Sequence, residues 1–208
     1  KGWKALEQTI DYINTNYPEI FTIADAKRGD IGNTSSMYAK AYFETLNFDS
    51  ITISPYMGKD SVEPFLEYNN KHTILLALTS NVGAFDFQTR DIADTSNKLY
   101  EEVIKTSTGW KNSNQLMYVI GATKATYLKD VRKIVPNNFL LIPGVGAQGG
   151  DLKEVCDNGM NNEVGLLINS SRSIIYASND TNFDVDAAKN SQEIQSKMEA
   201  ILTSKGFI

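Results

Sequence analysis

Two aspartates and a lysine lie within six residues of one another in the segment DAKRGD, at Asp25, Lys27 and Asp30. The segment follows the apolar run FTIA and precedes IGNTSSMYAKAYF, which has the pattern of a helix. Asp25 and Lys27 are two residues apart, so they share one face if the strand continues that far. A lysine between carboxylates can serve as a positioned acid. The alternative is a surface salt-bridge cluster in which Asp30 caps the following helix.

Two further segments have the composition of anion-binding loops. In PGVGAQGGD, residues 143–151, the glycines allow backbone N–H groups to converge on an anion at a helix N-terminus, although glycines also make plain turns. In NSSRS, residues 169–173, Ser171 and Ser173 can donate hydrogen bonds, and Arg172 can form a bidentate pair with a phosphate group. Both segments follow strand-like runs, so together they predict a phosphate site.

Strand-like and helix-like segments alternate along the whole chain. Each strand-like run is followed by a helical pattern, and repeated βα units of this kind predict a parallel sheet covered by helices. The predicted strands are residues 20–25, 50–54, 72–79, 115–122, 138–145 and 163–170. The predicted helices are residues 1–13, 35–46, 61–68, 91–106, 124–135, 149–159 and 184–206.

Six βα units preceded by an unpaired helix favour one particular architecture. A (β/α)8 TIM barrel has eight such units in about 250 residues. We therefore predict a single barrel domain over residues 1–208, with the first two strands upstream of Lys1, where the chain begins without a methionine. An open, doubly wound sheet is the structural alternative.

Composition and charge exclude several kinds of partner. The 208 residues are 41% hydrophobic and 22% charged, with a formal net charge of −5. That charge argues against binding to a nucleic-acid polymer or an anionic membrane, because no basic surplus exists to neutralise phosphates. The single cysteine, Cys156, precludes an intrachain disulfide and suits a reducing compartment, so a cytoplasmic location is expected. The sequence has no apolar stretch of the roughly 20 residues that a membrane span needs.

Four motifs together resemble the orotidine 5′-monophosphate decarboxylase family. DAKRGDIGNT is similar to the family signature D-x-K-x-x-D-I-x-x-T. TSNVGA, PGVGAQGGD and SSRSI are similar to the later pyrimidine and phosphate loops of that family, and they occur in the same order. The first motif is shared with sister decarboxylases of sugar phosphates, whereas the combination of four is specific. The resemblance covers essentially the whole chain.

The resemblance implies a cofactor-free decarboxylation of orotidine 5′-monophosphate to uridine 5′-monophosphate in pyrimidine biosynthesis. Loss of carbon dioxide from the pyrimidine leaves a poorly stabilised carbanion, which a lysine ammonium would stabilise and then protonate. Lys27 would be that lysine, Asp25 would lie beside the departing carboxylate, and Asp30 would complete the catalytic set. The implied substrate-binding residues are Ile31, Thr34, Ser80 at the pyrimidine edge, Pro143 in its pocket, Gln148 between base and phosphate, and Gly149, Ser171 and Arg172 at the phosphate.

The resemblance also implies a homodimer with composite active sites. Asp30, Ile31 and Thr34 would reach across the dimer interface into the partner's site, with Asp30 and Thr34 on the ribose side. No metal ion is implied, and the lone His72 opens a strand away from any metal-ligand spacing, so we predict a structural role for it.

The sequence departs from the family pattern in two ways, and two other functions stay open. Val82 stands where the family commonly has proline. The family's ribose-binding aspartate and a further active-site lysine belong to the first two strands, upstream of Lys1. One alternative is a metal-dependent sugar-phosphate decarboxylase, against which the TSN segment and the glutamine of GAQGG argue. The other is a barrel that binds nucleotide phosphates but is inactive without the upstream strands.

Overall fold

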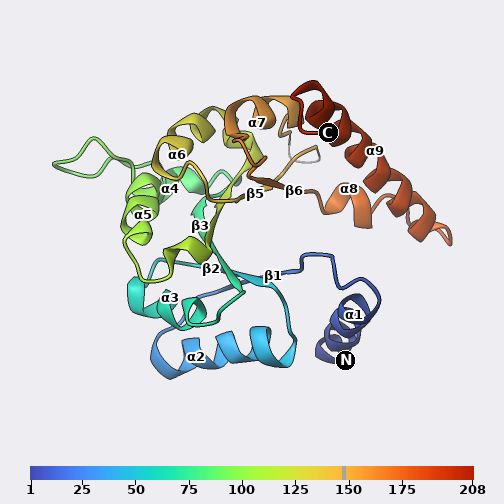
Figure 1. Cartoon of the computed structure of the whole chain (residues 1–208), viewed down its shortest axis with the longest axis horizontal. Helices are drawn as coiled ribbons and strands as arrows, with labels where there is room; N and C mark the ends of the chain where they lie inside the picture. Colours follow the sequence, from blue (N-terminus) through green and yellow to red (C-terminus); the bar gives the residue numbers. More distant parts are fainter. Residues whose placement is uncertain (147–148) are drawn as a thin grey trace. The chain divides into compact units, whose positions relative to one another are not determined.

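A computed structural model gives the arrangement of residues 1–146 and 149–208 (Figure 1). The described residues form six strands, in the order β1-β2-β3-β4-β5-β6 across one sheet. Pairing is parallel between β1 and β2, between β2 and β3, and between β5 and β6. The predicted α/β class and the alternation of strands and helices are therefore confirmed. The described part of the chain has six strands rather than eight, so a complete barrel stays a prediction.

The chain packs as two compact units, whose boundaries fall within β3, β4 and α5. The first unit comprises residues 1–77 and 102–118, and the second comprises residues 78–101 and 119–208. The first unit contains α1 (Gly2–Asn16), β1 (Ile23–Arg28), α2 (Gly32–Lys40), a π-helical turn (Ala41–Thr45), β2 (Ser50–Ile53), α3 (Lys59–Leu66) and a 3-10 turn (Ser113–Gln115). The three elements that are divided between the two units are β3 (His72–Leu78), α5 (Leu99–Thr108) and β4 (Leu116–Ile120).

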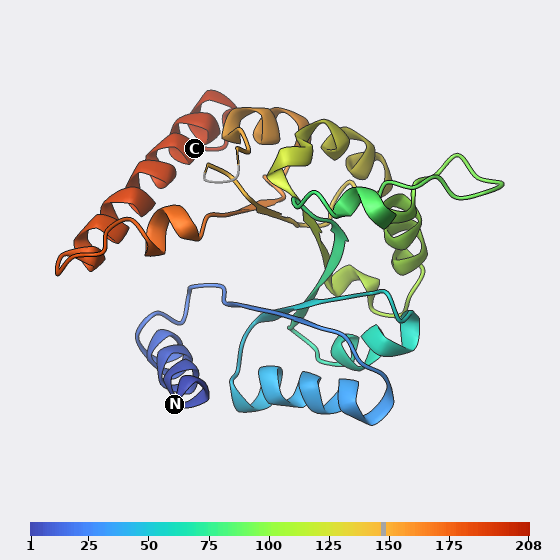
Figure 2. The ribbon, with the colours of Figure 1, turned by 180° about the vertical axis from the view of Figure 1, so that it is seen from behind.

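The core of the first unit forms around β2, whose four residues are all buried. A short, fully buried strand is typical of a parallel sheet covered on both faces. On the helical side, α2 and α3 lie side by side (Figure 2), and the Ser35 hydroxyl of α2 donates to the Ser61 carbonyl of α3 at 2.6 Å. Phe43 and Phe65 meet edge to face, with 6.3 Å between ring centroids. These helices hold the sheet from which β1 presents its charged residues.

Strand β1 occupies residues 23–28, three residues later than the predicted 20–25. Ile20 and Phe21 are largely exposed, because the chain before β1 is held by Asp49 instead of by a strand partner. The Asp49 carboxylate accepts hydrogen bonds from the Thr22 N–H at 2.8 Å and from its hydroxyl at 2.7 Å. The later start places both Asp25 and Lys27 inside the strand.

The predicted helix at residues 91–106 begins only at Leu99. The preceding residues instead form a projecting turn, visible in Figure 1. Asp91 and Lys98 pair across this turn in an isolated antiparallel bridge and a 3.0 Å ion pair. Asp94 adopts a left-handed conformation, with φ of 62°, which a helix interior does not accommodate.

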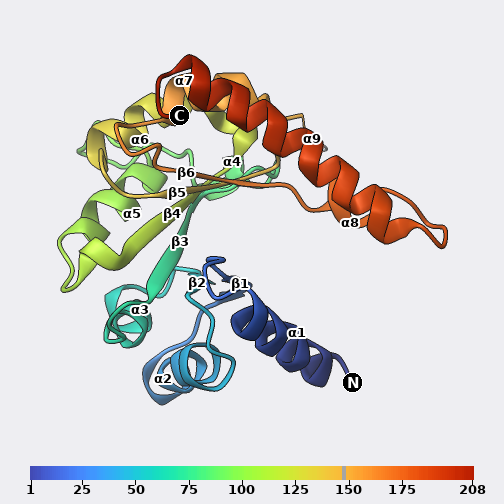
Figure 3. The ribbon, with the colours of Figure 1, turned by 45° about the vertical axis from the view of Figure 1, so that its right-hand side comes forward.

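The second unit contains β5, β6 and the helices that follow them. Its elements beyond the boundary ones are α4 (Ala84–Phe87), a 3-10 segment (Ala122–Tyr127), α6 (Leu128–Ile134), β5 (Leu140–Pro143), α7 (Leu152–Gly159), β6 (Leu166–Asn169), α8 (Arg172–Ile175) and α9 (Phe183–Ser204). The long helix α9 lies beside α8 (Figure 3). No helix in the described part of the chain combines the length and the apolar character that crossing a membrane requires.

Arg132 of α6 joins four backbone segments of the second unit. Its guanidinium donates to the carbonyls of Gly159, Val135, Asn138 and Gly165 at 2.6 to 3.2 Å. Burial lowers the pKa of Arg132 to about 10, so the guanidinium remains charged at neutral pH. Charge-assisted hydrogen bonds of this kind are stronger than neutral ones. They fix the end of α7 and the approaches to β5 and β6, the two strands that precede the predicted anion-binding loops.

Candidate active site

Asp25 and Lys27 form an ion pair at the carboxyl end of β1, with the Lys27 ammonium against Asp25 Oδ1. The Lys27 side chain is 52% exposed and the Asp25 side chain 62% exposed. The two residues lie in an irregular stretch of the strand, because the register between β1 and β2 shifts between Ala24 and Arg28. Lys27 itself is left-handed, with φ of 47°. A non-glycine residue in that region is uncommon, and such strain tends to concentrate at functional sites.

Asp30, Ile31 and Thr34 follow β1 at the start of α2. Asp30 does not cap the helix, because α2 begins at Gly32 with Ile31 in the capping position and without a side-chain cap. The Asp30 carboxylate instead accepts a hydrogen bond from the Ile31 N–H at 2.8 Å. Ile31 and Thr34 are exposed. This edge of the first unit therefore presents one half-buried carboxylate flanked by exposed side chains.

Ser80 lies in the loop that follows β3, within the second unit, and two contacts hold it close to the end of β4. The Thr123 hydroxyl donates to the Ser80 carbonyl at 3.2 Å. A Cβ atom at Gly121 would lie only 2.6 Å from Ser80 N and Cα, so only glycine permits the observed approach. Gln88 supports the loop from the other side, since its Oε1 accepts from the Thr79 N–H at 2.7 Å. Val82, in the family's proline position, is 84% exposed.

The glycine-rich loop after β5 folds back on itself. Gly144, Gly146 and Gly149 all have positive φ, which glycine alone adopts without strain. The Gly149 N–H donates to the Gly146 carbonyl at 2.8 Å, and the Gly150 N–H donates to the Gly144 carbonyl at 3.1 Å. The loop leads into α7, where Asp151 accepts from the Glu154 N–H at 2.7 Å as a side-chain cap. Gln148 lies outside the described residues.

The loops after β5 and β6 together enclose a small pocket of about 50 Å³. Ser171 and Arg172, both exposed, line it at the start of α8, opposite Pro143 at the end of β5. The Ser173 hydroxyl, predicted to donate toward an anion, instead pairs with the Ser170 hydroxyl at 2.6 Å. The complete lining is Pro143, Gly144, Val145, Asn169, Ser170, Ser171 and Arg172. The two loops that the sequence predicts to bind anions are therefore neighbours.

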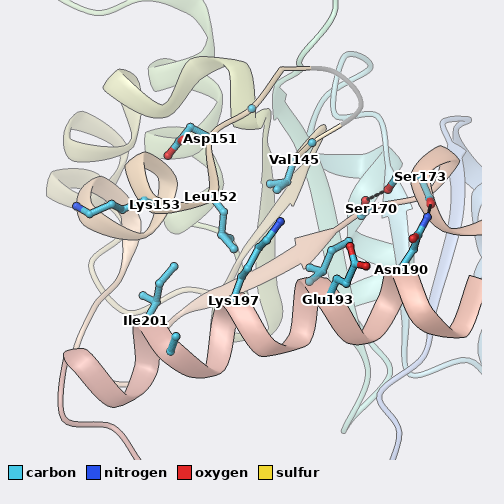
Figure 4. A pocket seen from close by; sticks show the side chains of 14 residues that line it. Val145, Asp151, Leu152, Lys153, Ser170, Ser173, Asn190, Glu193, Lys197 and Ile201 are labelled. Atoms are coloured by element: carbon cyan, nitrogen blue, oxygen red, sulfur yellow. Dashed lines mark hydrogen bonds between the residues drawn. The ribbon is translucent and has the colours of Figure 1, made fainter.

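A larger cleft of about 660 Å³ opens beside these loops, against α9 (Figure 4). Lys197 and Glu193 line it from α9, and Val145 and Ser170 line it from the loop side. Asn190 of α9 donates to the Ser173 carbonyl at 2.7 Å, which ties α9 to α8. Sequence reasoning missed the α9 residues because they lie beyond the motifs, with Asn190 already 17 residues after Ser173, in a segment that predicts only a helix.

Each unit thus places its polar residues at the carboxyl ends of its own parallel strands. A lysine–carboxylate pair lies at the end of β1, and a pocket of about 50 Å³ lies beyond β5 and β6. Parallel α/β enzymes keep their chemistry at these strand ends. Among the described residues no group of three or more His, Cys, Asp or Glu side chains is arranged to hold a metal ion. Fold and site together are those of an α/β enzyme whose candidate residues gather at the carboxyl ends of its strands.

Comparison with known proteins identifies the family. The family model described as "Orotidine 5'-phosphate decarboxylase / HUMPS family" matches residues 2–183, and the chain belongs to this family. It is 65% identical over 205 residues to the orotidine 5′-phosphate decarboxylase of Flavobacterium johnsoniae, covering 99% of this chain and 74% of the relative. It is 66% identical over 201 residues to the protein of that name from Christiangramia forsetii, covering 97% and 73%.

A solved structure agrees with the sequence relatives. The chain resembles the Leishmania donovani OMP decarboxylase with a TM-score of 0.79 and 36% identity, over 94% of this chain and 74% of that one. The chain therefore spans about three quarters of the length of each of these three proteins. The family assignment predicted from the four motifs is confirmed.

Proposed function

We propose that this protein catalyses the decarboxylation of orotidine 5′-monophosphate to uridine 5′-monophosphate, a step of pyrimidine biosynthesis. The observation that carries the proposal is 65% identity over 99% of the chain to a protein with that name. The four motifs lie within the match. The sugar-phosphate alternative and the inactive barrel are not favoured, because relatives that are 65% and 66% identical bear the name of the nucleotide decarboxylase. A cytoplasmic location suits the single free cysteine.

In the proposed reaction, the Lys27 ammonium stabilises negative charge at the pyrimidine carbon that loses carbon dioxide, then donates its proton there. Its ion pair with Asp25 places the lysine ammonium against a carboxylate at the carboxyl end of β1. Asp25 lies beside the departing carboxylate. Ser80 and Pro143 contact the pyrimidine. Gln148, Gly149, Ser171 and Arg172 bind the phosphate end, where Arg172 offers a bidentate pair.

The phosphate is remote from the reacting carbon, so its binding energy is available to organise the site. We further propose that the six strands are six of the eight in a (β/α)8 barrel that forms a single domain. About a quarter of each relative lies outside the match. That length suffices for two βα units, given roughly 30 residues for a whole βαβ motif.

The test follows the conversion of orotidine 5′-monophosphate by the full-length protein in the presence of EDTA. We expect turnover without added metal, because the proposed chemistry uses a lysine ammonium alone. Lys27→Ala should lower kcat by more than the roughly 10²–10⁴-fold usual for loss of a general acid, since charge stabilisation is lost as well. Lys40→Ala, an exposed lysine on α2, is the matched control and should retain full activity.

Two results would contradict the proposal. Complete loss of turnover on chelation, restored by magnesium, would favour the metal-dependent sugar-phosphate decarboxylase. A Lys27→Ala variant with more than about a tenth of wild-type activity, equivalent to less than about 1.4 kcal/mol of barrier, would remove Lys27 from the proposed role.

We also propose a homodimer in which Asp30, Ile31 and Thr34 enter the partner's site. Their place at an exposed helix start supports this assignment, and a two-fold interface is the commonest way to share sites reciprocally. The test mixes inactive Lys27→Ala and Asp30→Ala subunits under conditions of exchange. Half of the dimers are then mixed, and each has one intact site of two, so activity should recover to about one quarter of wild type. A mixture that stays inactive despite proven exchange would show that Asp30 serves its own subunit.

A further inference from the structure

A buried hydroxyl lies directly opposite the irregular stretch of β1. Ala24 pairs with Ile51 and Arg28 pairs with Ile53, so three residues of β1 face a single residue of β2, Thr52. Thr52 is fully buried, with 0% exposure. A bulge of this kind leaves ladder hydrogen bonds unmade and redirects side chains, and bulges are common beside active sites. Some other group must satisfy the freed backbone N–H groups.

The Thr52 hydroxyl satisfies one of them and also contacts a proposed catalytic side chain. Its Oγ1 accepts a hydrogen bond from the Lys27 N–H at 2.9 Å. The same oxygen lies 3.1 Å from Asp25 Oδ1 and 3.4 Å from the Ala24 carbonyl oxygen, as donor to either. A hydroxyl has one hydrogen to donate, and the ionised, closer acceptor forms the stronger bond. The hydroxyl hydrogen therefore goes to Asp25.

These two hydrogen bonds act on the two features that set the geometry of the pair. The first holds the backbone of Lys27 in its left-handed conformation, φ 47°, which costs a lysine about 1–3 kcal/mol and persists only where the surrounding structure imposes it. The second fixes Asp25 Oδ1, the oxygen that also receives the Lys27 ammonium. Thr52 Oγ1 therefore couples the direction of the Lys27 side chain to the orientation of the Asp25 carboxylate.

We propose that Thr52 is a positioning residue for the decarboxylation, which sets the Lys27–Asp25 pair through its hydroxyl without touching the substrate. This inference rests on the proposed function of Lys27 and Asp25. Positioning matters because a misplacement of about 1 Å at a reacting group can cost roughly 10²-fold in rate. Thr52 lies outside all four family motifs, and nothing in its local sequence, SITIS, indicates a catalytic connection.

The test compares substitutions that keep or remove the hydroxyl. Thr52→Val keeps the shape and removes the hydrogen bonds, whereas Thr52→Ser keeps the hydroxyl and loses a methyl group. Thr73→Val on the neighbouring strand β3 is the matched control. Thr73 is equally buried, and its hydroxyl has no hydrogen-bond partner among residues 1–146 and 149–208. Removing it costs no hydrogen bond.

We expect Thr52→Val to lower kcat by roughly 10- to 100-fold, or about 1.4 to 2.7 kcal/mol of barrier. The KM and the binding of uridine 5′-monophosphate, measured by calorimetry, should change less than about threefold, because Thr52 does not reach the substrate. Thr52→Ser and Thr73→Val should stay within about threefold of wild-type kcat. In an Asp25→Asn background, Thr52→Val should cause less additional loss than in the wild type, because both changes affect the same pair.

The outcomes separate this inference from the function it rests on. An inactive wild-type protein would reject the proposed function, and the inference with it. An active wild type with a Thr52→Val variant as active as Thr73→Val would reject the inference alone. Equal kcat losses in Thr52→Val and Thr52→Ser would also reject it, because the hydroxyl would then be irrelevant. If Thr52→Val does not fold, Thr52→Cys replaces it. Its thiol is a weaker donor than a hydroxyl, so kcat should fall below that of Thr52→Ser, and equality would again reject the inference.

Discussion

Gly150 offers a direct test of whether the loop after β5 must hold its observed position. A methyl group at Gly150 would lie 2.3 Å from Ala122 Cβ and 2.8 Å from the Gly144 carbonyl oxygen. Carbon atoms in contact lie about 3.5–4.0 Å apart. Gly150→Ala therefore requires a displacement of roughly 1 Å or more. Ala122 is buried at the start of the 3-10 segment that follows β4, so we expect the loop to move instead of Ala122.

The expected loss follows from that displacement. The loop is closed by hydrogen bonds at both ends of Gly150, whose N–H donates to Gly144 and whose carbonyl accepts from Gly146, each at 3.1 Å. A movement at Gly150 is therefore passed to the loop's other glycines. For a misplacement of about 1 Å, kcat/KM should fall roughly 100-fold, or about 2.7 kcal/mol. Overpacking should also lower the free energy of unfolding by about 1–3 kcal/mol.

The assay is steady-state turnover of orotidine 5′-monophosphate, with calorimetric binding of uridine 5′-monophosphate. Gly109→Ala is the control, because its methyl group would meet nothing closer than 3.5 Å. Adding Ala122→Gly to Gly150→Ala should restore part of the loss, since the 2.3 Å contact disappears while the contact with Gly144 remains. A folded Gly150→Ala variant with kcat/KM within about twofold of wild type would refute the reasoning.

Two predictions concern stability. Burial raises the pKa of Tyr118 from its usual 10.0 to about 12, so the neutral phenol, 2.9 Å from the Ser107 hydroxyl, stabilises the fold fully below pH 10. That stabilisation, about 2.7 kcal/mol, is lost as the pH rises from 10 through 12. The free energy of unfolding, measured with urea, should therefore decrease less steeply with pH over this range in Tyr118→Phe than in the wild type. An unchanged slope would contradict the reasoning. Arg132→Met should lower the free energy of unfolding by about 3 kcal/mol, because four backbone carbonyls lose their donor. Arg90→Met, at an exposed arginine, should change it by less than about 0.5 kcal/mol, and equal effects of the two arginine variants would contradict the role of Arg132.

The order of strands and helices was predictable because buried strands and buried helix faces require apolar residues at characteristic spacings. Strand β4 is buried at every position, and such a strand appears in the sequence as a short, nearly continuous apolar run, here LMYVI. The start of β1 was not predictable from the same signal. Ile20 and Phe21 have side chains that favour a strand. The hydrogen bonds from Thr22 to Asp49 nevertheless hold the chain in a loop as far as Thr22, so the strand begins at Ile23. That contact joins residues 27 positions apart, which a local pattern does not encode.

The candidate site was predictable where a residue's chemistry is unusual for its place. A lysine between two aspartates and an arginine among serines are visible without coordinates. The residues that support them have ordinary types. Thr52 faces a bulge whose existence depends on the register of two strands, and Asn190 of α9 bonds the carbonyl of Ser173 in α8, 17 residues earlier in the chain. Register and helix placement are tertiary properties, so these residues become visible only in three dimensions.

The exposure of the Lys27–Asp25 pair limits what it achieves by itself. More than half of each side chain is exposed, and two unit charges 4 Å apart are worth only about 1 kcal/mol in water. The same separation at an effective dielectric of 20 is worth about 4 kcal/mol. The attraction between the two charges therefore becomes about fourfold stronger when the pair is shielded from water, without any change in their separation. In the proposed dimer, the start of the partner's α2 provides that cover and brings the carboxylate of its Asp30 toward the pair. On this argument, the proposed role of Thr52 is to set the direction of the Lys27 side chain. Burial of the pair in the dimer then strengthens the attraction between Lys27 and Asp25.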